Sequence, residues 1–290
     1  MSSSLRDLTF DDIPSSMDLS TVAGWNQTPE DWSRILRLSP GGCRCIEVEE
    51  EVVATTTLLE YGTDLAWVGM VLTRPEHRRK GLARRLLEDA IAHAKRDGIR
   101  TLKLDATEEG RPLYESLGFV VEGAIERWGR RDQSMPGKDG RTLNSDSLSR
   151  QLEQLGRAMP NHLLALDVEA FGASRKVVLR ELSRSRANLS TSGYVLSRPG
   201  RTARSIGPCV ASSEDEAVHL IAEHLAMHES AAEDFQISWY WDLLPSNAAA
   251  AKCAAHFGFT RHRALWRMRR GKPIENNDAI VFATAGFELG

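Results

Sequence analysis

The chain has few cysteines, no long apolar run and no excess of charge of one sign. Four cysteines occur among 290 residues without a Cys-x-x-Cys pair, which favours reduced thiols over a disulfide framework or zinc knuckle. Lys and Arg number 37 against 40 Asp and Glu, so no global field attracts nucleic acid or an anionic membrane. No apolar run approaches bilayer-crossing length, and the first residues lack a secretory-signal pattern. We therefore expect a soluble cytoplasmic protein whose partners include neither nucleic acid nor membrane.

The length allows for two domains. A chain of 290 residues with 41% hydrophobic residues is ordinary for a packed globular protein of this size. The segment 129–140 is polar, rich in glycine and interrupted by Pro136, which predicts a surface loop or linker. We divide the chain into a first domain, 1–133, a linker, 134–155, and a second domain, 156–290.

A basic loop with a glycine stands between an apolar strand and an amphipathic helix. The loop, Arg78-Arg79-Lys80-Gly81, follows the strand-like segment 67–72 and precedes apolar residues at helical spacing, namely Leu86, Leu87, Ala90, Ile91 and Ala94. A helix N-terminus presents unpaired N–H groups and the positive end of the helix dipole. Gly81 lets the backbone approach a ligand closely. The pattern therefore predicts a site for a diphosphate.

Two segments resemble the GNAT acetyltransferase superfamily. Arg78-x-x-Gly81-x-Ala83 fits the Arg/Gln-x-x-Gly-x-Gly/Ala signature of that family, and Leu113-Tyr114-x-x-Leu117-Gly118-Phe119 resembles its Leu-Tyr-x-x-Leu-Gly-Phe segment. They occur in the family's order, separated by one helix and one strand. The resemblance implies an α/β (α+β) fold with a mixed, mostly antiparallel central sheet flanked by helices. It also implies direct transfer of an acetyl group from acetyl-CoA to an amine of a small molecule, without a metal.

The resemblance assigns roles to individual residues. Tyr114 is the expected catalytic general acid, because a phenol with a pKa near ~10 stays protonated and can protonate the departing thiolate. Gly69 predicts a β-bulge that frees backbone groups of its strand. Thr107 stands where many members of the family have an Asn. The expected cofactor-binding residues are Met70, Val71, Leu72, Arg78, Arg79, Lys80, Gly81, Leu82, Ala83 and Thr107.

The acceptor site is less defined by the sequence. Trp25, Trp67 and Asp105 are candidates for contacts with the amine. The group that takes the proton of the ammonium is open among Glu60, Asp64, Asp105 and a chain of water molecules.

One histidine pair has the spacing of two metal ligands on a helix. His224 and His228 stand four apart in a helical segment. Because the zinc-protease Glu is missing between them and no third ligand is evident, we predict a solvated helix face instead.

The second half repeats the first faintly. Gly258-Phe259 follows Gly118-Phe119 at a spacing of 140 residues, and Arg267 follows Arg127 at the same spacing. The resemblance extends to a bacterial subgroup with two such domains in tandem, whose further marks include the terminal Ala285-Gly286-x-Glu288-x-Gly290.

The second copy lacks the cofactor signals. No glycine occurs between Gly207 and Gly258, acids at 214–216 open the helix that corresponds to the cofactor helix, and Ala254 replaces the tyrosine. We expect a degenerate domain that does not bind acetyl-CoA. A non-catalytic acyl-CoA sensor remains the alternative to an N-acetyltransferase.

Overall fold

The computed structural model describes residues 3–130, 159–230 and 238–290, so the predicted linker 134–155 lies outside the described residues. Two compact units are present. Unit 1 comprises Met1–Gly123, Leu265–Glu275 and Phe287–Gly290, and unit 2 comprises Ala124–Ala264 and Asn276–Gly286. The sequence predicts contiguous domains, whereas each compact unit contains segments from both halves of the chain.

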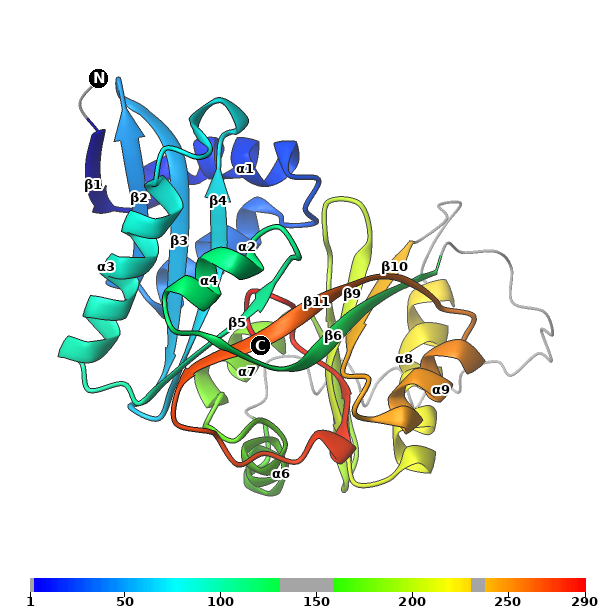
Figure 1. Ribbon diagram of the computed structural model, residues 1–290. Helices are drawn as coiled ribbons and strands as arrows, with labels where there is room; N and C mark the ends of the chain where they lie inside the picture. The colour runs from blue at the N-terminus through cyan, green and yellow to red at the C-terminus, as the bar shows by residue number, and fades with distance from the viewer. Residues whose placement is uncertain (1–2, 131–158, 231–237) are drawn as a thin grey trace. The chain divides into compact units, whose positions relative to one another are not determined.

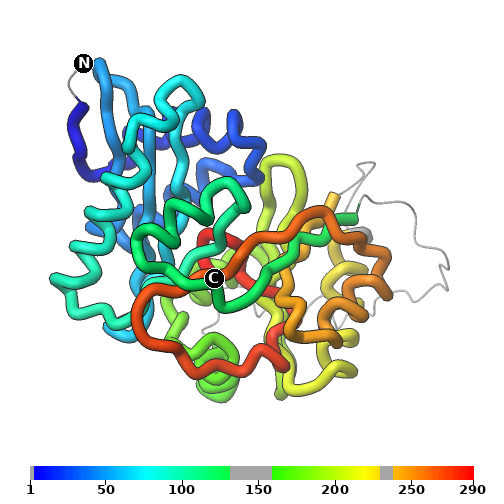
Figure 2. The backbone as a smooth tube through the Cα atoms, in the orientation of Figure 1, coloured from blue at the N-terminus to red at the C-terminus, as the bar shows by residue number. Residues whose placement is uncertain are grey.

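Unit 1 is a mixed sheet with helices on both faces (Figure 1). Only the pairing of β4 with β5 is parallel among the strand pairs described in this unit. The strands, in spatial order, are β1 (Ser3–Asp7), β2 (Cys43–Val48), β3 (Glu51–Tyr61), β4 (Leu65–Thr73), β5 (Thr101–Ala106) and the second part of β11 (Thr260–Gly271), which is orange in Figure 2. The helices are α1 (Ile13–Val22), α2 (Pro29–Leu38), α3 (Leu82–Arg96) and α4 (Arg111–Ser116), with short 3₁₀ turns η1 (Phe10–Asp12) and η2 (Pro75–His77).

Local sequence signals explain the start of helix α2 and the buried face of helix α3. Helix α2 begins where Thr28 and Asp31 form a capping box, with the Thr28 hydroxyl accepting from the Asp31 N–H at 3.2 Å. Helix α3 buries Leu86, Leu87, Ala90 and Ala94 against the sheet, as their helical spacing predicts. Strands β2 and β3 pair antiparallel and form a hairpin.

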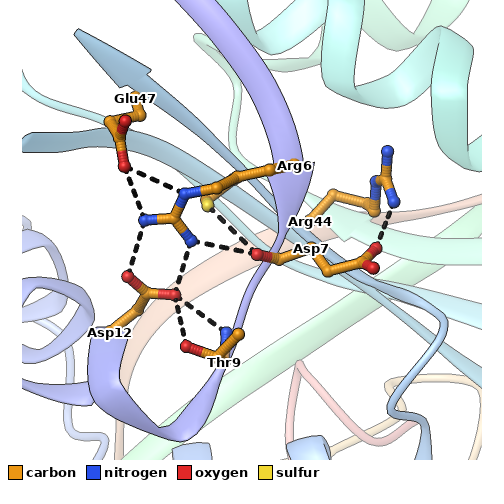
Figure 3. A network of polar contacts seen from close by, with 7 residues as sticks. Arg6, Asp7, Thr9, Asp12, Arg44 and Glu47 are labelled. Atoms are coloured by element: carbon orange, nitrogen blue, oxygen red, sulfur yellow. Dashed lines mark hydrogen bonds and ion pairs between the residues drawn. The ribbon is translucent and has the colours of Figure 1, made fainter. Parts of the chain in front are cut away.

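An ion-pair network fastens the edge of this sheet (Figure 3). The Arg6 guanidinium on β1 donates to Asp12 of η1 at 2.8 and 2.9 Å. It also donates to Glu47 of β2 at 2.8 and 2.9 Å. The hydrogen bond from Arg6 holds the pKa of the Asp12 carboxyl below its usual range. Beside it, Arg44 pairs with Asp7, so β1, β2 and η1 are joined through charged side chains.

Unit 2 contains a mixed set of strands and its own apolar core. Its spatial order is β6-β10-β9-β8-β7, with β12 on β9, and only β9 and β10 pair in parallel among the described pairs. The strands are β6 (Val120–Arg130), β7 (Arg186–Leu189), β8 (Gly193–Arg198), β9 (Arg204–Ala211), β10 (Trp239–Leu243) and β12 (Val281–Ala283). The helices are α6 (Asn161–Phe171), α7 (Lys176–Leu182), α8 (Glu214–Ser230), α9 (Ala248–His256) and the 3₁₀ turn η3 (Asp278–Ile280). Within the described ranges, no helix combines the length and apolarity needed to cross a membrane.

Each unit receives one strand from the other half of the sequence, and a buried ion pair marks each exchange. In unit 1, Arg267 of β11 donates to both oxygens of Asp105 on β5 at 2.9 and 3.0 Å. In unit 2, Arg127 of β6 donates to both oxygens of Asp242 on β10 at 2.7 and 2.6 Å. The two arginines are the pair that the sequence repeat relates, so the repeat reflects an equivalent strand and ion pair in each unit.

The histidine pair of α8 is buried, so the predicted solvated face is wrong. His224 and His228 are 0% and 3% exposed, with ring centroids 5.0 Å apart. His224 Nδ1 lies 2.7 Å from Asn188 Oδ1, and His228 Nε2 lies 3.1 Å from Ser197 Oγ. The spacing of four residues does place both rings on one face of α8, but that face lies against β7 and β8 rather than water. Burial lowers the pKa of His224 to about 3 and that of His228 to about 2.

We expect unit 2 to lose stability as the pH falls from 7 to 5. Both folded-state pKa values lie below those of the unfolded chain, so the unfolded state takes up protons near pH ~6.5 while the folded state does not. Each histidine then lowers the free energy of unfolding by at most about 1.4 kcal/mol per pH unit below pH ~6.5. Urea unfolding at both pH values measures the slope. It should be smaller in His228→Gln and unchanged in His219→Gln, whose side chain is exposed on the same helix; equal slopes in all three proteins would contradict the assignment.

Candidate cofactor and active site

A β-bulge interrupts β4 where the sequence predicts it. Thr57 of β3 pairs with Gly69 and Thr55 pairs with Leu72, so one residue of β3 faces both Met70 and Val71. Met70 has a φ of 47°, and its carbonyl accepts from the Thr55 hydroxyl at 2.8 Å. A bulge leaves one residue outside the ladder, which makes backbone groups of this part of β4 available to a ligand.

The parallel pair β4 and β5 separates just before the bulge. Within the described residues, their ladder consists of Ala66 with Leu102 and Trp67 with Lys103. From Gly69 to Leu72, β4 therefore has its ladder partners on the β3 side only. Ligands of α/β sheets commonly bind at the carboxyl ends of parallel strands. The bulge lies at this end of β4.

The loop between β4 and α3 presents an uncapped helix N-terminus. Gly81 occupies the N-cap position with a φ of 80°, and no side chain caps the helix. The first helical hydrogen bond at this end runs from the Arg85 N–H to the Gly81 carbonyl at 3.0 Å. The N–H groups of the preceding turn therefore have no acceptor within the helix. Arg78, Arg79 and Lys80 are exposed beside them. Helix dipole, free N–H groups and cations together favour an anion here.

A pocket adjoins this loop. Its wall consists of α1 residues and of the chain that leaves β4, namely Asp18, Leu19, Val22, Ala23, Thr73, Arg74, Pro75, Glu76 and Arg78. Arg78 therefore belongs both to the basic loop and to a concave surface of unit 1.

Tyr114 lies on α4 and is 9% exposed. Its ring contacts Phe119 edge-on, with the centroids 6.0 Å apart. Among the described residues its hydroxyl has no hydrogen-bond partner. Burial raises the pKa of the Tyr114 phenol, so the hydroxyl stays protonated at neutral pH and can donate a proton.

Thr107 and its counterpart in unit 2 have capping roles. Thr107 is exposed, and its hydroxyl accepts from the Gly110 N–H at 3.2 Å in the turn before α4. Asn247 caps α9 through bonds from the N–H groups of Ala249 and Ala250 at 3.1 and 3.2 Å. The Asn247 amide also donates to two backbone carbonyls at 3.0 and 2.9 Å. The asparagine of unit 2 is thus used to hold its own helix.

Two residues predicted for the acceptor site are occupied by structural contacts. Trp67 is 1% exposed, and its Nε1 donates to the Phe287 carbonyl at 2.8 Å. The Asp105 side chain is 0% exposed in its bidentate pair with Arg267. Trp25, in contrast, is half-buried in the loop between α1 and α2. Trp67 and Asp105 thus anchor segments from the end of the chain in unit 1.

The other two candidate bases contact nitrogen atoms of neighbouring side chains. Glu60 lies 3.0 Å from His93 Nε2, and Asp64 pairs with Arg100. Glu60, His93 and Asp97 bring possible ligand atoms within 4.8 Å of one another. The contacts of His93 with both carboxylates account for this closeness.

Sequence reasoning missed three residues that the structure gathers near the bulge. Glu288 lies against Gly69, since a Cβ on Gly69 would stand 3.2 Å from the Glu288 backbone and 3.1 Å from the Thr57 hydroxyl. Gln27 Nε2 donates to Glu288 Oε2 at 3.2 Å. The glutamate in the terminal Gly-x-Glu-x-Gly segment was the only signal in the sequence for this group.

In unit 2, the first turn of the corresponding helix is acidic. Helix α8 begins with Glu214, Asp215 and Glu216, whose negative charges repel a diphosphate. At the position of the tyrosine stands Ala254, which is fully buried. The N-terminus of α3 therefore suits an anion better than that of α8 does.

Comparisons with known proteins match both halves of the chain. The acetyltransferase (GNAT) family matches residues 9–119, and an acetyltransferase (GNAT) domain matches residues 163–283. The uncharacterized N-acetyltransferase YitH of Bacillus subtilis (strain 168) is 25% identical over 73% of this chain and 79% of its own length.

Solved structures have the same fold. A protein structure from Pyrococcus horikoshii superimposes with a TM-score of 0.81 at 22% identity, covering 99% of this chain and 96% of that one. A tandem GNAT protein from the clavulanic acid biosynthesis pathway gives a TM-score of 0.62 at 17% identity, covering 94% of this chain and 99% of its own. With both halves matched and the cofactor-type loop present in the first, the chain belongs to the GNAT family of acyltransferases and carries two GNAT domains in tandem.

Proposed function

We propose that this protein is an acetyl-CoA-dependent N-acetyltransferase that transfers the acetyl group directly to an amine of a small molecule, with its site in unit 1. The observation that carries the proposal is the combination, in one unit, of an uncapped α3 N-terminus, a bulged β4 and a buried, protonated tyrosine. In unit 2, the Ser213 hydroxyl accepts from the Glu216 N–H at 3.3 Å at the start of α8, acids follow in its first turn, and Ala254 stands at the position that corresponds to Tyr114.

The residues of the loop fit the pyrophosphate of acetyl-CoA. The N–H groups of the α3 first turn, including those of Leu82 and Ala83, bind phosphate oxygens, and Arg78, Arg79 and Lys80 neutralise their charge. The open space around the Gly81 Cα, where a Cβ would meet nothing within 4 Å, leaves room for close approach. The backbone of Met70, Val71 and Leu72 at the bulge binds the amide groups of the pantetheine arm. Thr107 contacts the cofactor from the turn after β5.

The chemistry requires a neutral amine and a proton for the departing thiolate. A backbone N–H at the bulge polarises the thioester carbonyl, so that the amine nitrogen attacks its carbon while the C–S bond breaks. Tyr114 protonates the thiolate, whose conjugate acid has a pKa of about 8.5. Because burial raises the pKa of the Tyr114 phenol, the hydroxyl is protonated before each turnover.

Release of free CoA distinguishes the enzyme from a non-catalytic acyl-CoA sensor. The full chain with acetyl-CoA should release thiol, detected with a thiol reagent, when primary amines such as alkylamines, arylalkylamines and polyamines are added one by one. Release above the level without amine supports the enzyme. Tight acetyl-CoA binding with no amine-dependent release across such a panel would support the sensor instead.

We expect Gly81→Val to weaken acetyl-CoA binding by tenfold or more, about 1.4 kcal/mol. A β-branched residue is strained at a φ of 80° and forces the loop to change, which displaces the N–H groups from the phosphates. The matched control is Gly98→Val, since Gly98 follows the other end of α3 with a φ of 70° and equally open surroundings. Calorimetric titration with acetyl-CoA measures both. Equal affinities of the two variants would contradict the loop assignment.

A further inference from the structure

We propose that Glu288, together with Gln27 and Thr57, binds the ammonium group of the acceptor amine. The inference rests on the proposed function and assigns the acceptor subsite within it. These residues come from three separate parts of unit 1: the loop between α1 and α2, strand β3, and the segment Phe287–Gly290 that joins this unit from the end of the chain.

The position of the group follows from Gly69. A Cβ at Gly69 would lie 3.1 Å from the Thr57 hydroxyl and 3.2 Å from both the Cα and the carbonyl oxygen of Glu288. Gly69 directly precedes the bulge at Met70, where β4 presents the backbone groups assigned to acetyl-CoA. The backbone of Glu288 therefore lies against the strand that positions the thioester in the proposed function.

The segment that carries Glu288 is firmly seated. The Tyr61 hydroxyl donates to the Leu289 carbonyl at 2.5 Å, and Trp67 Nε1 donates to the Phe287 carbonyl at 2.8 Å. Backbone bonds on both sides of Glu288 thus fix its place against β3 and β4. Such pre-organisation is what a substrate-binding carboxylate requires.

Two hydrogen-bond acceptors in this group have no partner among the described residues. Thr57 is 1% exposed, and its hydroxyl is buried without a hydrogen bond there. The Gln27 Oε1 is likewise buried without one, although its Nε2 donates to Glu288. A buried polar atom without a hydrogen bond costs about 1–3 kcal/mol. Such atoms therefore point to a ligand that forms the missing hydrogen bonds.

The ligand chemistry follows from the donor set. A carboxylate, an amide oxygen and a hydroxyl oxygen all accept hydrogen bonds, and a primary ammonium has three N–H donors and one positive charge. The 4% exposed Glu288 carboxylate supplies the matching negative charge. A neutral alcohol or a quaternary ammonium satisfies only part of this set.

The same contact provides the proton path for transfer. The ammonium gives one proton to the Glu288 carboxylate, which passes it to water, and the neutral amine attacks the thioester carbon. The new C–N bond forms as the C–S bond breaks, the nitrogen loses its second proton to the same path, and the Tyr114 hydroxyl protonates the thiolate and is reprotonated from water. The balance is one ammonium and one acetyl-CoA giving one amide, one CoA thiol and one released proton.

Direct binding of a simple cation tests the site without a known substrate. The probe is n-butylammonium chloride, with n-butanol as the neutral control and tetramethylammonium as the cation without N–H groups, each added to the full chain and followed by saturation-transfer NMR. We expect n-butylammonium to bind and both controls to bind at least tenfold more weakly. Glu288→Gln should raise the dissociation constant for n-butylammonium by tenfold or more, while Glu51→Gln, an exposed carboxylate at the start of β3, should not change it.

A second variant covers the case in which Glu288→Gln does not fold. Thr57→Val keeps the shape, removes one acceptor and should weaken n-butylammonium binding several-fold. Either the absence of n-butylammonium binding to the wild-type chain or equal binding by wild type, Glu288→Gln and Thr57→Val would overturn the inference. Failure of the wild-type chain to bind acetyl-CoA would instead overturn the proposed function, and the ammonium measurement does not depend on it.

Discussion

Tyr114→Phe is expected to lower the turnover number by about 10²-fold or more, with little change in the Michaelis constant for acetyl-CoA. The substitution keeps the ring that packs on Phe119 with the centroids 6.0 Å apart and removes only the hydroxyl. That hydroxyl has no hydrogen-bond partner among the described residues, so the free energy of unfolding should stay nearly unchanged. A loss confined to turnover therefore identifies a proton donor rather than a packing residue.

Steady-state kinetics with an amine that the wild-type chain acetylates, together with urea unfolding, provide the measurement. Tyr240→Phe in unit 2 serves as the matched control, because it removes a phenol hydroxyl from the other unit and should leave turnover intact. Full activity of Tyr114→Phe would mean that water or another group protonates the thiolate. A parallel loss of stability and acetyl-CoA affinity would indicate a structural role.

Arg267→Met is expected to destabilise unit 1 by about 3–5 kcal/mol, the cost of breaking a buried ion pair by removing its cation. The Asp105 side chain is 0% exposed and that of Arg267 is 13% exposed, with both oxygens of the carboxylate engaged. Arg267 also lies over the ring of Trp67 at 4.7 Å, so its loss removes packing as well. Urea unfolding at pH 7 measures the effect.

Arg269→Met on the same strand is the matched control. Its partner Glu122 is 23% exposed, so the expected loss is about 1 kcal/mol or less. Adding Asp105→Asn to Arg267→Met should recover part of the stability, because the uncompensated charge is removed. Similar losses of unfolding free energy in the two single variants would show that the buried ion pair stabilises unit 1 no more than the pair of Arg269 with Glu122.

The same ion pair changes what is expected of a shortened chain. The sequence division at 133 implies that the first domain can bind acetyl-CoA by itself. In the structure, unit 1 also requires β11 residues that pair with β5 and the segment Phe287–Gly290. A chain ending near Gln133 lacks both, and with them the Arg267 guanidinium that pairs with Asp105, so we expect it not to fold stably.

The parts of the fold set by nearby residues could be predicted from the sequence. The capping box of Thr28 and Asp31, the hairpin of β2 and β3 and the bulge next to Gly69 each depend on a few adjacent residues, and the structure contains all three. The basic loop with Gly81 was found for the same reason, since its strand, glycine and helix are contiguous.

The strand exchange and the Glu288 group could not be predicted in this way. The alternation of residues in a strand indicates that it has a buried face but not which sheet it joins. The division into 1–133 and 156–290 therefore does not indicate that β6 residues belong to unit 2 or that β11 residues belong to unit 1. Helical spacing likewise gave the period of His224 and His228 but not the polar partners, Asn188 and Ser197, that permit their burial. Glu288 meets Gly69 only through folding, because 219 residues of chain separate them.

Calorimetric titration of the full chain with acetyl-CoA tests the central claim most directly, namely that unit 1 alone carries the cofactor site. The uncapped, glycine-bearing N-terminus of α3 predicts one molecule of acetyl-CoA per chain, whereas the acidic first turn of α8 predicts none in unit 2. One site per chain that is weakened by Gly81→Val and kept by Gly98→Val is the expected result. Two equivalent sites per chain, or one site unaffected by Gly81→Val, would contradict the account.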